Sequence, residues 1–284
     1  MFLSKHRISK ALTLCLALLA YPASAQEVAI TLDDLPYVMP SRTTPEQGLQ
    51  IVRDVNAALD KHDITATGFA VGGLINAQTR VVMDTFADAG HTIGNHSWSH
   101  PDYDTLTKRA FRREVRRTDR ALKGWMQGQK YYRFPFLREG NTETRKQAAE
   151  DVLERLGYVN APVTIDNDEW RFNKDYVEAL DAGDKQDAHR IAQAYLAHMK
   201  ERTGFFQSLA KRAVGRDVSH ILLLHMNKIN ADHLENLLDW YAASGWTFVT
   251  LPDALRDPLY AAPDLYAGPQ GLSQIERVMG HKAN

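Results

Sequence analysis

The stretch VAITLDDLP, residues 28–36, decides the fold of this chain. Residues 28–32 are apolar or β-branched, a pattern typical of a short buried strand. Asp33 and Asp34 follow, and Pro36 then ends any regular pairing. A buried strand with polar residues at its end is typical of a parallel sheet or barrel, in which the loops at the carboxyl ends of the strands carry the chemistry.

Strands and helices alternate along the rest of the chain, which predicts an α/β fold with parallel strands. Between residues 172 and 214 the pattern is wholly helical, so we expect a helical elaboration that covers one side of the sheet or barrel. Strand patterns occur at 67–71, 91–94, 131–134, 158–165, 218–224 and 246–249, and helical patterns at about 46–61, 77–89, 107–126, 142–156 and 232–243.

The first 25 residues have the pattern of a secretory signal peptide. Three basic residues come first, residues 11–20 are apolar, and Ala23-Ser24-Ala25 supplies a small-residue cleavage site. The apolar run is much shorter than the roughly 20 residues that span a bilayer. We therefore predict removal of residues 1–25, no stable membrane anchor afterwards, and a periplasmic or secreted protein.

Composition limits the class of partner. Cys15, the only cysteine, lies inside the predicted signal peptide, so the mature protein has no thiol and relies on its core for stability. Loss of three basic residues leaves 31 Lys and Arg against 35 Asp and Glu, a net charge of −4. That balance argues against nucleic acid as a partner.

No linker or internal repeat divides the mature chain, which indicates one catalytic domain over residues 26–257. Proline and glycine at 258, 263, 268, 269 and 271 predict an irregular surface tail over 258–284, with no chemistry in it.

A basic run, Lys108 to Arg120, has helical spacing with Glu114 and Asp119 interspersed. We interpret it as a solvated helix face; contact with an anionic glycan or surface is the alternative.

His96 and His100 are the strongest sign of a metal site. Histidines four residues apart in a helical turn present both imidazoles on one face. Two histidines and one carboxylate leave a position for water, and either Asp33 or Asp34 can complete the set. The remaining aspartate would act as a general base, although two adjacent aspartates can also be a simple turn or helix cap.

These motifs closely resemble those of the polysaccharide deacetylase superfamily, carbohydrate esterase family four. Five motifs occur in order between Thr31 and His225. The resemblance implies a distorted (β/α) barrel of about seven parallel strands, with the helical elaboration before the last catalytic strand. By resemblance, residues 31–34 supply Asp33 as the catalytic base and Asp34 as a metal ligand. Residues 96–101, HSWSHP, supply His96 and His100 as ligands for zinc, with cobalt or nickel also suitable.

Residues 133–136, RFPF, resemble the third motif of this family. The resemblance implies that Arg133 orients the base and that the backbone N–H of Phe136 binds the oxyanion. A surface salt bridge is the simpler interpretation of Arg133. The family usually has glycine at the next position, where this chain has Leu137, so the shape of this loop stays open.

Residues 166–170, DNDEW, resemble the fourth motif of the family, and residues 223–225, LLH, resemble the fifth. The resemblance implies that Asp166 tunes the catalytic histidine and that Trp170 walls the acyl pocket, although such a tryptophan also serves plain packing. His225 would protonate the leaving amine, and Leu223 would line the pocket.

The leading expectation is therefore a metal-dependent hydrolase that removes acetyl groups from N-acetylated or O-acetylated sugars of a polysaccharide or peptidoglycan fragment. Hydrolysis of a small non-sugar amide on the same scaffold is a related alternative. A non-catalytic glycan-binding or metal-binding protein is a different class. The presence of a base, three ligands, an arginine and an acid argues against it, because binding alone needs none of this combination.

Overall fold

The computed structural model describes residues 26–38 and 42–283. The predicted signal peptide and Cys15 lie outside the described residues, so their prediction is untested. Within the described part of the chain, no helix is both long enough and apolar enough to cross a membrane.

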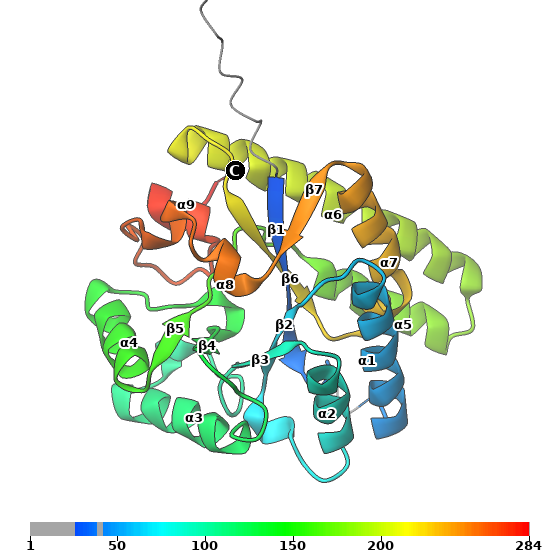
Figure 1. Cartoon of the computed structure of the whole chain (residues 1–284), viewed down its shortest axis with the longest axis horizontal. Helices are drawn as coiled ribbons and strands as arrows, with labels where there is room; N and C mark the ends of the chain where they lie inside the picture. The colour runs from blue at the N-terminus through cyan, green and yellow to red at the C-terminus, as the bar shows by residue number, and fades with distance from the viewer. Residues whose placement is uncertain (1–25, 39–41, 284) are drawn as a thin grey trace, which may run out of the picture.

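Seven parallel strands form the centre of the molecule (Figure 1). Their order is β5-β4-β3-β2-β1-β6, and β7 pairs with β1 outside this path. The strands are β1 (Gln26–Leu35), β2 (Thr67–Ala70), β3 (Thr92–Asn95), β4 (Lys130–Tyr132), β5 (Tyr158–Asn160), β6 (Ser219–His225) and β7 (Trp246–Val249). β1 is central because Val28, Ala29 and Leu32 are fully buried, as the apolar pattern of this stretch predicts.

The segment after β5 crosses the open side of the sheet. Ile165 forms a parallel bridge with Leu222 of β6, and the N–H groups of Thr164 and Ile165 donate to the carbonyl of Ile221 at 3.0 and 3.1 Å. The ring of strands is therefore completed only by irregular backbone. The prediction of an α/β fold with about seven parallel strands and a distorted barrel shape is confirmed, whereas the predicted strand 158–165 is wrong beyond residue 160 because the chain leaves β4 there.

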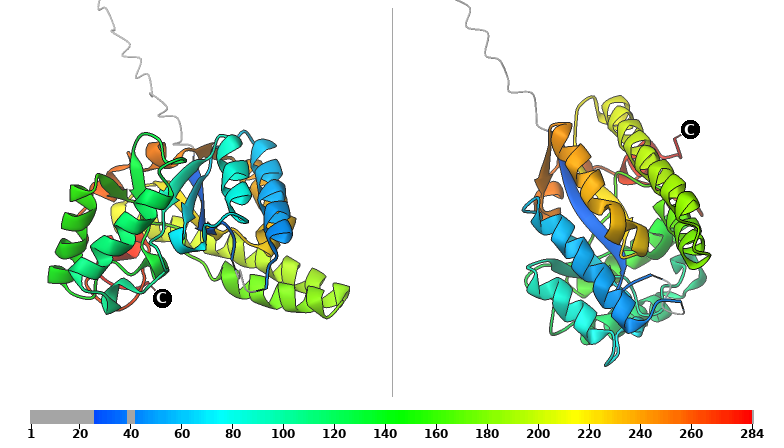
Figure 2. Two further views of the ribbon diagram at one scale, coloured as in Figure 1. Left: turned by 90° about the horizontal axis from the view of Figure 1, so that it is seen from below. Right: turned by 90° about the vertical axis from the view of Figure 1, so that its right-hand side faces the viewer.

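Helices cover the outside of this sheet (Figures 1 and 2). α1 begins with a capping box in which Thr44 and Gln47 satisfy each other's backbone N–H groups. The helices are α1 (Pro45–Asp60), α2 (Arg80–Asp88), α3 (Lys108–Ala121), α4 (Glu143–Arg155), α5 (Glu169–Asp181), α6 (Lys185–Val214), α7 (Lys228–Ala243), α8 (Leu251–Ala254) and α9 (Gln274–Met279), with 3₁₀ turns η1 (Gly72–Leu74), η2 (Tyr103–Thr105), η3 (Pro135–Leu137) and η4 (Pro258–Ala261).

The predicted helical elaboration is confirmed as the pair α5 and α6, which lies directly before β6 in the chain. α6 buries Tyr195, Met199 and Phe206 in the main core and extends past the other helices at one side (Figure 2). Because α5 begins at Glu169, within the fourth motif, its first turn lies at the carboxyl edge of the sheet.

The prediction of an irregular surface tail is wrong in part. Residues 274–279 form α9, whose capping box joins Ser273 and Glu276. Leu272 and Ile275 are only 2% and 0% exposed, and the N–H of Gln274 donates to the carbonyl of Val163 at 2.7 Å. A six-residue helix is too short to show a period, and the prolines and glycines before it dominate the local pattern. Tertiary burial stabilises this helix.

Candidate active site

One cavity of about 530 Å³ opens at the carboxyl edge of the sheet, where the polar motifs end their strands. Arg133 lies buried beneath it, and the other site residues predicted from the sequence line its wall. These are Asp33, Asp34, His96, His100, Phe136, Asp166, Trp170, Leu223 and His225.

The register of the sheet explains much of this convergence. β1 and β6 are parallel neighbours, and Asp33 pairs directly with His225. Asp34 follows with a left-handed backbone, φ 64°, which aspartate tolerates better than most residues. This turn directs two consecutive carboxylates to different neighbours, and Asp34 reaches the histidines of the loop after β3.

The two histidines lie on a loop after β3, so the expected helical turn is wrong. Ser97 and His100 both have left-handed backbones, with φ of 67° and 53°. Buried side chains hold this shape, because Glu114 accepts the N–H groups of Trp98 and Ser99 and the Ser97 hydroxyl accepts the N–H of His100. The imidazoles still converge, with ring centroids 4.9 Å apart.

Asp34, His96 and His100 form a metal-type triad, whose ligand atoms lie within 4.8 Å of one another. Oδ1 of Asp34 is 3.7 Å from Nε2 of His96 and 3.4 Å from Nε2 of His100. Nδ1 of His96 bonds to the carbonyl of Arg133 at 2.9 Å, which leaves Nε2 for a ligand bond. Burial, with the neighbouring His100, lowers the pKa of His96 to about 3, so its imidazole is neutral. Two nitrogens and one carboxylate oxygen fit a divalent transition metal.

Arg133 and Asp33 form a buried ion pair, and Arg133 is only 1% exposed. Its Nη1 donates to Asp33 at 2.9 Å and to the Thr31 hydroxyl at 2.8 Å, while Nε donates to the carbonyl of Ala161. The simpler interpretation as a surface salt bridge is therefore wrong. Burial lowers the pKa of Arg133, and the Asp33 carboxylate opposes that change. The arginine fixes one oxygen of Asp33, while the other lies 3.6 Å from Nε2 of His96.

The loop that carries Phe136 has an unusual backbone. Phe136 and the Leu137 that replaces the family glycine both have positive φ, 57° and 54°. Within the described residues the N–H of Phe136 has no hydrogen-bond acceptor, and its ring lies against His100 at a centroid distance of 4.7 Å. Leu137 is buried in a small apolar cluster, so side-chain packing holds a conformation that glycine would adopt freely.

The C-terminal segment reaches this loop. Gly271 lines the 530 Å³ cavity, and a Cβ atom added to it would lie 1.9 Å from the carbonyl oxygen of Phe136. No side chain fits at position 271 unless the backbone moves. The expectation that the tail has no part in the chemistry therefore needs correction, because Gly271 supports the loop with the free N–H.

The partner of His225 also differs from the expected one. Nδ1 of His225 lies 2.7 Å from Oε2 of Glu169, a residue that is 0% exposed. The other carboxylate oxygen of Glu169 accepts hydrogen bonds from the side-chain amides of Asn227 and Asn230. No hydrogen bond or ion pair joins Asp166 to His225 among the described residues, so Glu169, and not Asp166, is the carboxylate that contacts this histidine.

Glu169 determines the charge of His225. Burial alone would lower the pKa of His225, but the Glu169 carboxylate outweighs it, with smaller contributions from Asp34 and Asp33, and raises the pKa to about 9. His225 is therefore protonated at neutral pH, with Nδ1 held by Glu169 and Nε2 available to the cavity. Asp166 differs, because burial and the carboxylate of Glu276 raise its pKa to about 6.

The residue of the fourth motif that contacts His225 is therefore Glu169, near the end of the motif. The sequence pattern favoured Asp166 because it matches the family position, but α5 starts at Glu169, and the first turn of the helix points this side chain inward. A buried glutamate three residues after the matched aspartate is a signal visible in the sequence only once the helix start is known. Trp170, the next residue, is 47% exposed and lines the same cavity as Leu223 of β6.

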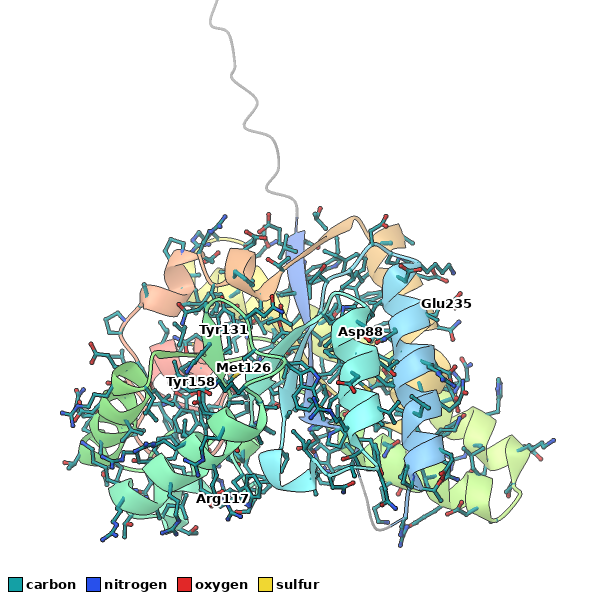
Figure 3. All side chains as sticks on the ribbon, turned by 60° about the horizontal axis from the view of Figure 1, so that its bottom comes forward. Asp88, Arg117, Met126, Tyr131, Tyr158 and Glu235 are labelled. Atoms are coloured by element: carbon teal, nitrogen blue, oxygen red, sulfur yellow. The ribbon has the colours of Figure 1, made fainter. Side chains whose placement is uncertain are left out.

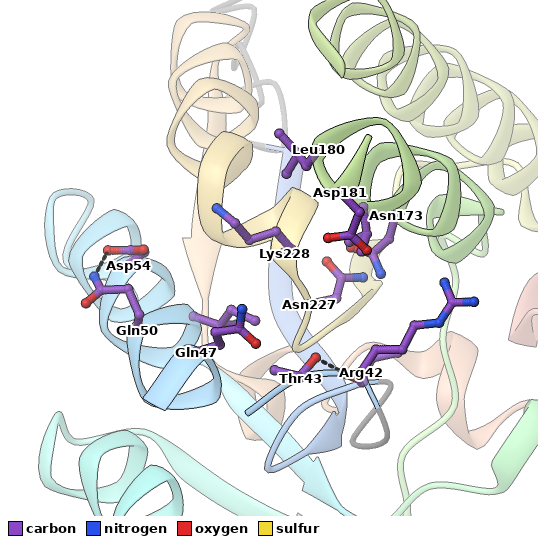
Figure 4. Close-up of a pocket in the computed structure, with 13 residues that line it drawn as sticks. Arg42, Thr43, Gln47, Gln50, Asp54, Asn173, Leu180, Asp181, Asn227 and Lys228 are labelled. Carbon is purple, nitrogen blue, oxygen red and sulfur yellow. Dashed lines mark hydrogen bonds between the residues drawn. The ribbon is translucent and has the colours of Figure 1, made fainter. Parts of the chain in front are cut away.

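Two further cavities adjoin the site. One of about 430 Å³ is lined by Asp34, His100 and Trp98, so it continues from the triad in the direction of α3. Another of about 290 Å³ lies between α1, α5 and α7, and its wall includes Arg42, Asn173 and Lys228 (Figure 4). Both share Val38 with the catalytic cavity. We call the three cavities that meet at Val38 the catalytic groove of the candidate site.

Fold and site together define a distorted (β/α) barrel hydrolase scaffold with an Asp/His/His metal-type centre. A family model described as polysaccharide deacetylase matches residues 20–160. The chain belongs to the polysaccharide deacetylase superfamily.

Two relatives illustrate this membership. An uncharacterized 30.6 kDa protein of Geobacillus stearothermophilus is 26% identical over 73% of this chain and 67% of its own length. A peptidoglycan-N-acetylglucosamine deacetylase of Bacillus cereus is 29% identical over 36% of this chain and 32% of its own length. The match to the second therefore spans only about a third of that relative.

Solved structures show the same fold. PdaA of Bacillus subtilis, a family 4 carbohydrate esterase, superposes with a TM-score of 0.54 at 21% identity, covering 81% of each chain. BA3943 of Bacillus anthracis, described as a family 4 pseudoenzyme, gives a TM-score of 0.53 at 18% identity over 82% of this chain and 66% of its own. The fold therefore occurs both with and without catalysis.

Proposed function

We propose that this protein is a metal-dependent hydrolase that removes acetyl groups from N-acetylated sugars of a polysaccharide or peptidoglycan fragment. The observation that carries the proposal is the meeting of three units in one cavity: the metal-type triad, the Asp33–Arg133 pair and the His225–Glu169 pair. Membership of the superfamily supports the same substrate class. The predicted signal peptide supports export of this protein, and detection of a mature N-terminus at Gln26 would test that location.

The chain's own groups divide the chemistry between a base and an acid. A divalent metal held by Asp34, His96 and His100 would polarise the acetamide carbonyl and make water more acidic. Asp33, oriented by Arg133, takes a proton from the attacking water. His225, already protonated because of Glu169, gives a proton to the departing amine.

Backbone geometry and apolar side chains complete the site. The free N–H of Phe136 is available to the oxygen that gains negative charge during attack, and a preorganised donor of this kind lowers a barrier by roughly 3 kcal/mol. Leu223, which is 6% exposed, and Trp170 line the same cavity and can enclose a methyl group. The small apolar wall favours acetyl over longer acyl groups.

Metal removal and restoration test the proposed activity directly. We expect a chelator to abolish acetate release, and zinc, cobalt or nickel to restore it, because the triad supplies two imidazoles and one carboxylate. The assay measures acetate from acetylated chitooligosaccharide, peptidoglycan and xylan, which separates N-deacetylation from O-deacetylation. Bound metal with no acetate from any glycan would contradict the proposal and favour a small non-sugar amide or a binding protein.

Gly271→Ala tests the support of the oxyanion loop by the C-terminal segment. The added Cβ would overlap the carbonyl of Phe136, so the loop must shift and its N–H must leave its position. We expect kcat to fall about tenfold, less than the loss from deleting such a donor. Gly204→Ala on α6 is the matched control, since nothing lies within 4 Å of its added Cβ. Equal kcat values for the two variants would show that Gly271 is not needed.

A further inference from the structure

α3 and the turn after it present a large basic face. Its members are exposed and have no ion pair or hydrogen bond to an acid within residues 26–38 and 42–283. Lys108 differs, because it pairs with Asp151 at 2.8 Å. We call the following set the basic face: Arg109, Arg112, Arg113, Arg116, Arg117, Arg120 and Lys123.

The two acids of α3 do not neutralise this face. Glu114 is 9% exposed and accepts hydrogen bonds from the Trp98–Ser99 segment of the histidine loop. Asp119 accepts from Lys130 at 2.7 Å and from the Tyr158 hydroxyl at 2.8 Å. The interpretation of this run as a solvated helix face agrees with the exposure of its arginines, but both acids of α3 bond to neighbouring segments and leave the face basic.

The positive charges of the basic face do not stabilise the fold of α3. Arg109 lies in the first turn of α3, where a cation opposes the helix dipole. Four pairs of arginines, 109/113, 112/116, 113/117 and 116/120, stand four residues apart and repel each other. The surrounding chain carries a net negative charge, so this concentration is local. Because these charges destabilise the helix that carries them, we infer that they serve binding of an anionic partner.

The basic face is continuous with the catalytic groove. The guanidinium of Arg117 lies over the Trp98 ring at 3.9 Å from its centroid, and Trp98 lines the cavity that also contains Asp34 and His100. Figure 3 shows Arg117 on α3, at the outer edge of the molecule. α3 has 14 residues and is therefore about 21 Å long. A chain that leaves the triad past Trp98 reaches this helix.

We propose that the basic face binds the carboxylates of an anionic N-acetylated glycan whose acetylated sugar lies at the metal-type triad. The inference rests on the proposed function and names its substrate class. Six of the seven cations are arginines, whose planar guanidinium groups pair with carboxylates through two parallel hydrogen bonds. The continuity of the face with the groove favours one polymer that contacts both over a separate partner.

The test compares two acetylated oligosaccharides, neutral chitopentaose and a hyaluronan fragment with alternating carboxylates. Its variant is Arg113→Gln/Arg116→Gln/Arg120→Gln, which leaves Arg117 on Trp98. The matched control is Arg53→Gln/Lys185→Gln/Arg212→Gln, which removes three exposed cations of α1 and α6 that have no ion pair within the described chain. Both variants change the net charge by the same amount, and thermal unfolding shows whether each is folded.

We expect the ratio of kcat/KM on the anionic glycan to kcat/KM on the neutral glycan to exceed one for the unmodified protein. The α3 variant should lower that ratio about tenfold, mainly through KM, and added salt should lower it as well. The control variant should keep the ratio. A ratio that is unchanged in the α3 variant, or that falls equally in the control, would overturn the proposal.

A binding measurement separates this inference from the proposed function. Fluorescence anisotropy of a labelled hyaluronan fragment, with metal-free protein, needs no turnover. If acetate release fails on every glycan but binding depends on the α3 arginines, the deacetylase proposal fails and the anionic-glycan surface stands. If the α3 variant loses binding to phosphatidylglycerol vesicles or duplex DNA while hyaluronan binding is unchanged, the surface serves another partner and the inference is wrong.

Discussion

Replacing Asp33 with asparagine is expected to leave metal binding intact and to lower kcat by about 10²–10⁴-fold, the contribution typical of a general base. The metal-type triad uses Asp34, so its ligands are unchanged in this variant. An asparagine side chain has a similar shape and can still accept the Arg133 hydrogen bond, but it cannot take a proton from water. Metal content by elemental analysis and kcat by acetate release measure the two properties separately.

Asp34→Asn is the matched control for this experiment. It removes the carboxylate of the triad, so we expect loss of bound metal together with loss of turnover. The neighbouring positions should therefore give different results, with metal kept in one variant and lost in the other. Full turnover in Asp33→Asn with metal bound would show that Asp33 is not the base, and equal metal loss in both would place Asp33 among the ligands.

Glu169→Gln is expected to lower kcat about 10²-fold above neutral pH, because the neutral amide no longer stabilises the protonated form of His225. Glutamine has nearly the same shape as glutamate, and its amide oxygen can still accept the hydrogen bonds from the side-chain amides of Asn227 and Asn230. The measurement is kcat across a pH series, with thermal unfolding as the test of folding.

Activity is expected to fall at alkaline pH, as His225 loses its proton. His225 must be protonated to act as an acid, and its pKa of about 9 keeps activity up to that pH. Without the Glu169 charge, burial lowers the pKa of His225, so the alkaline fall in activity should move to lower pH. Stability follows the same direction: the pair's contribution is complete below the ordinary pKa of 6.5 and is lost as pH rises through about 9.

Asp166→Asn is the contrasting variant, because family resemblance alone assigns the tuning role to that position. Asp166 has no hydrogen bond or ion pair with His225 among the described residues, so we expect the alkaline limb to stay where it is in the unmodified protein. If Asp166→Asn shifts this limb and Glu169→Gln does not, the assignment from the structure is wrong and the one from the motif is right.

Much of the site could be predicted from the sequence because the relevant signals are local. Apolar runs that stop at Asp33 and His225 identify strand ends, and parallel strands bring such ends to one edge. The His96 and His100 pair identifies a metal-type site by residue type and spacing. The strand ends need only the period of a strand and the rule for parallel strands, whereas the role of each residue came from its chemistry and from the family resemblance.

Other features were decided only by the tertiary structure, because they depend on which groups meet across large distances in the chain. Glu169 replaces Asp166 beside His225 through the inward direction of the first turn of α5. Gly271 reaches the Phe136 loop from a segment whose prolines and glycines predict only irregular structure. The sequence by itself thus determined the strand ends and the chemistry of their residues. Packing between distant segments decided the charge of the acid, the support of the oxyanion loop and the exposure of the α3 arginines, since burial and pairing are properties of the assembled fold.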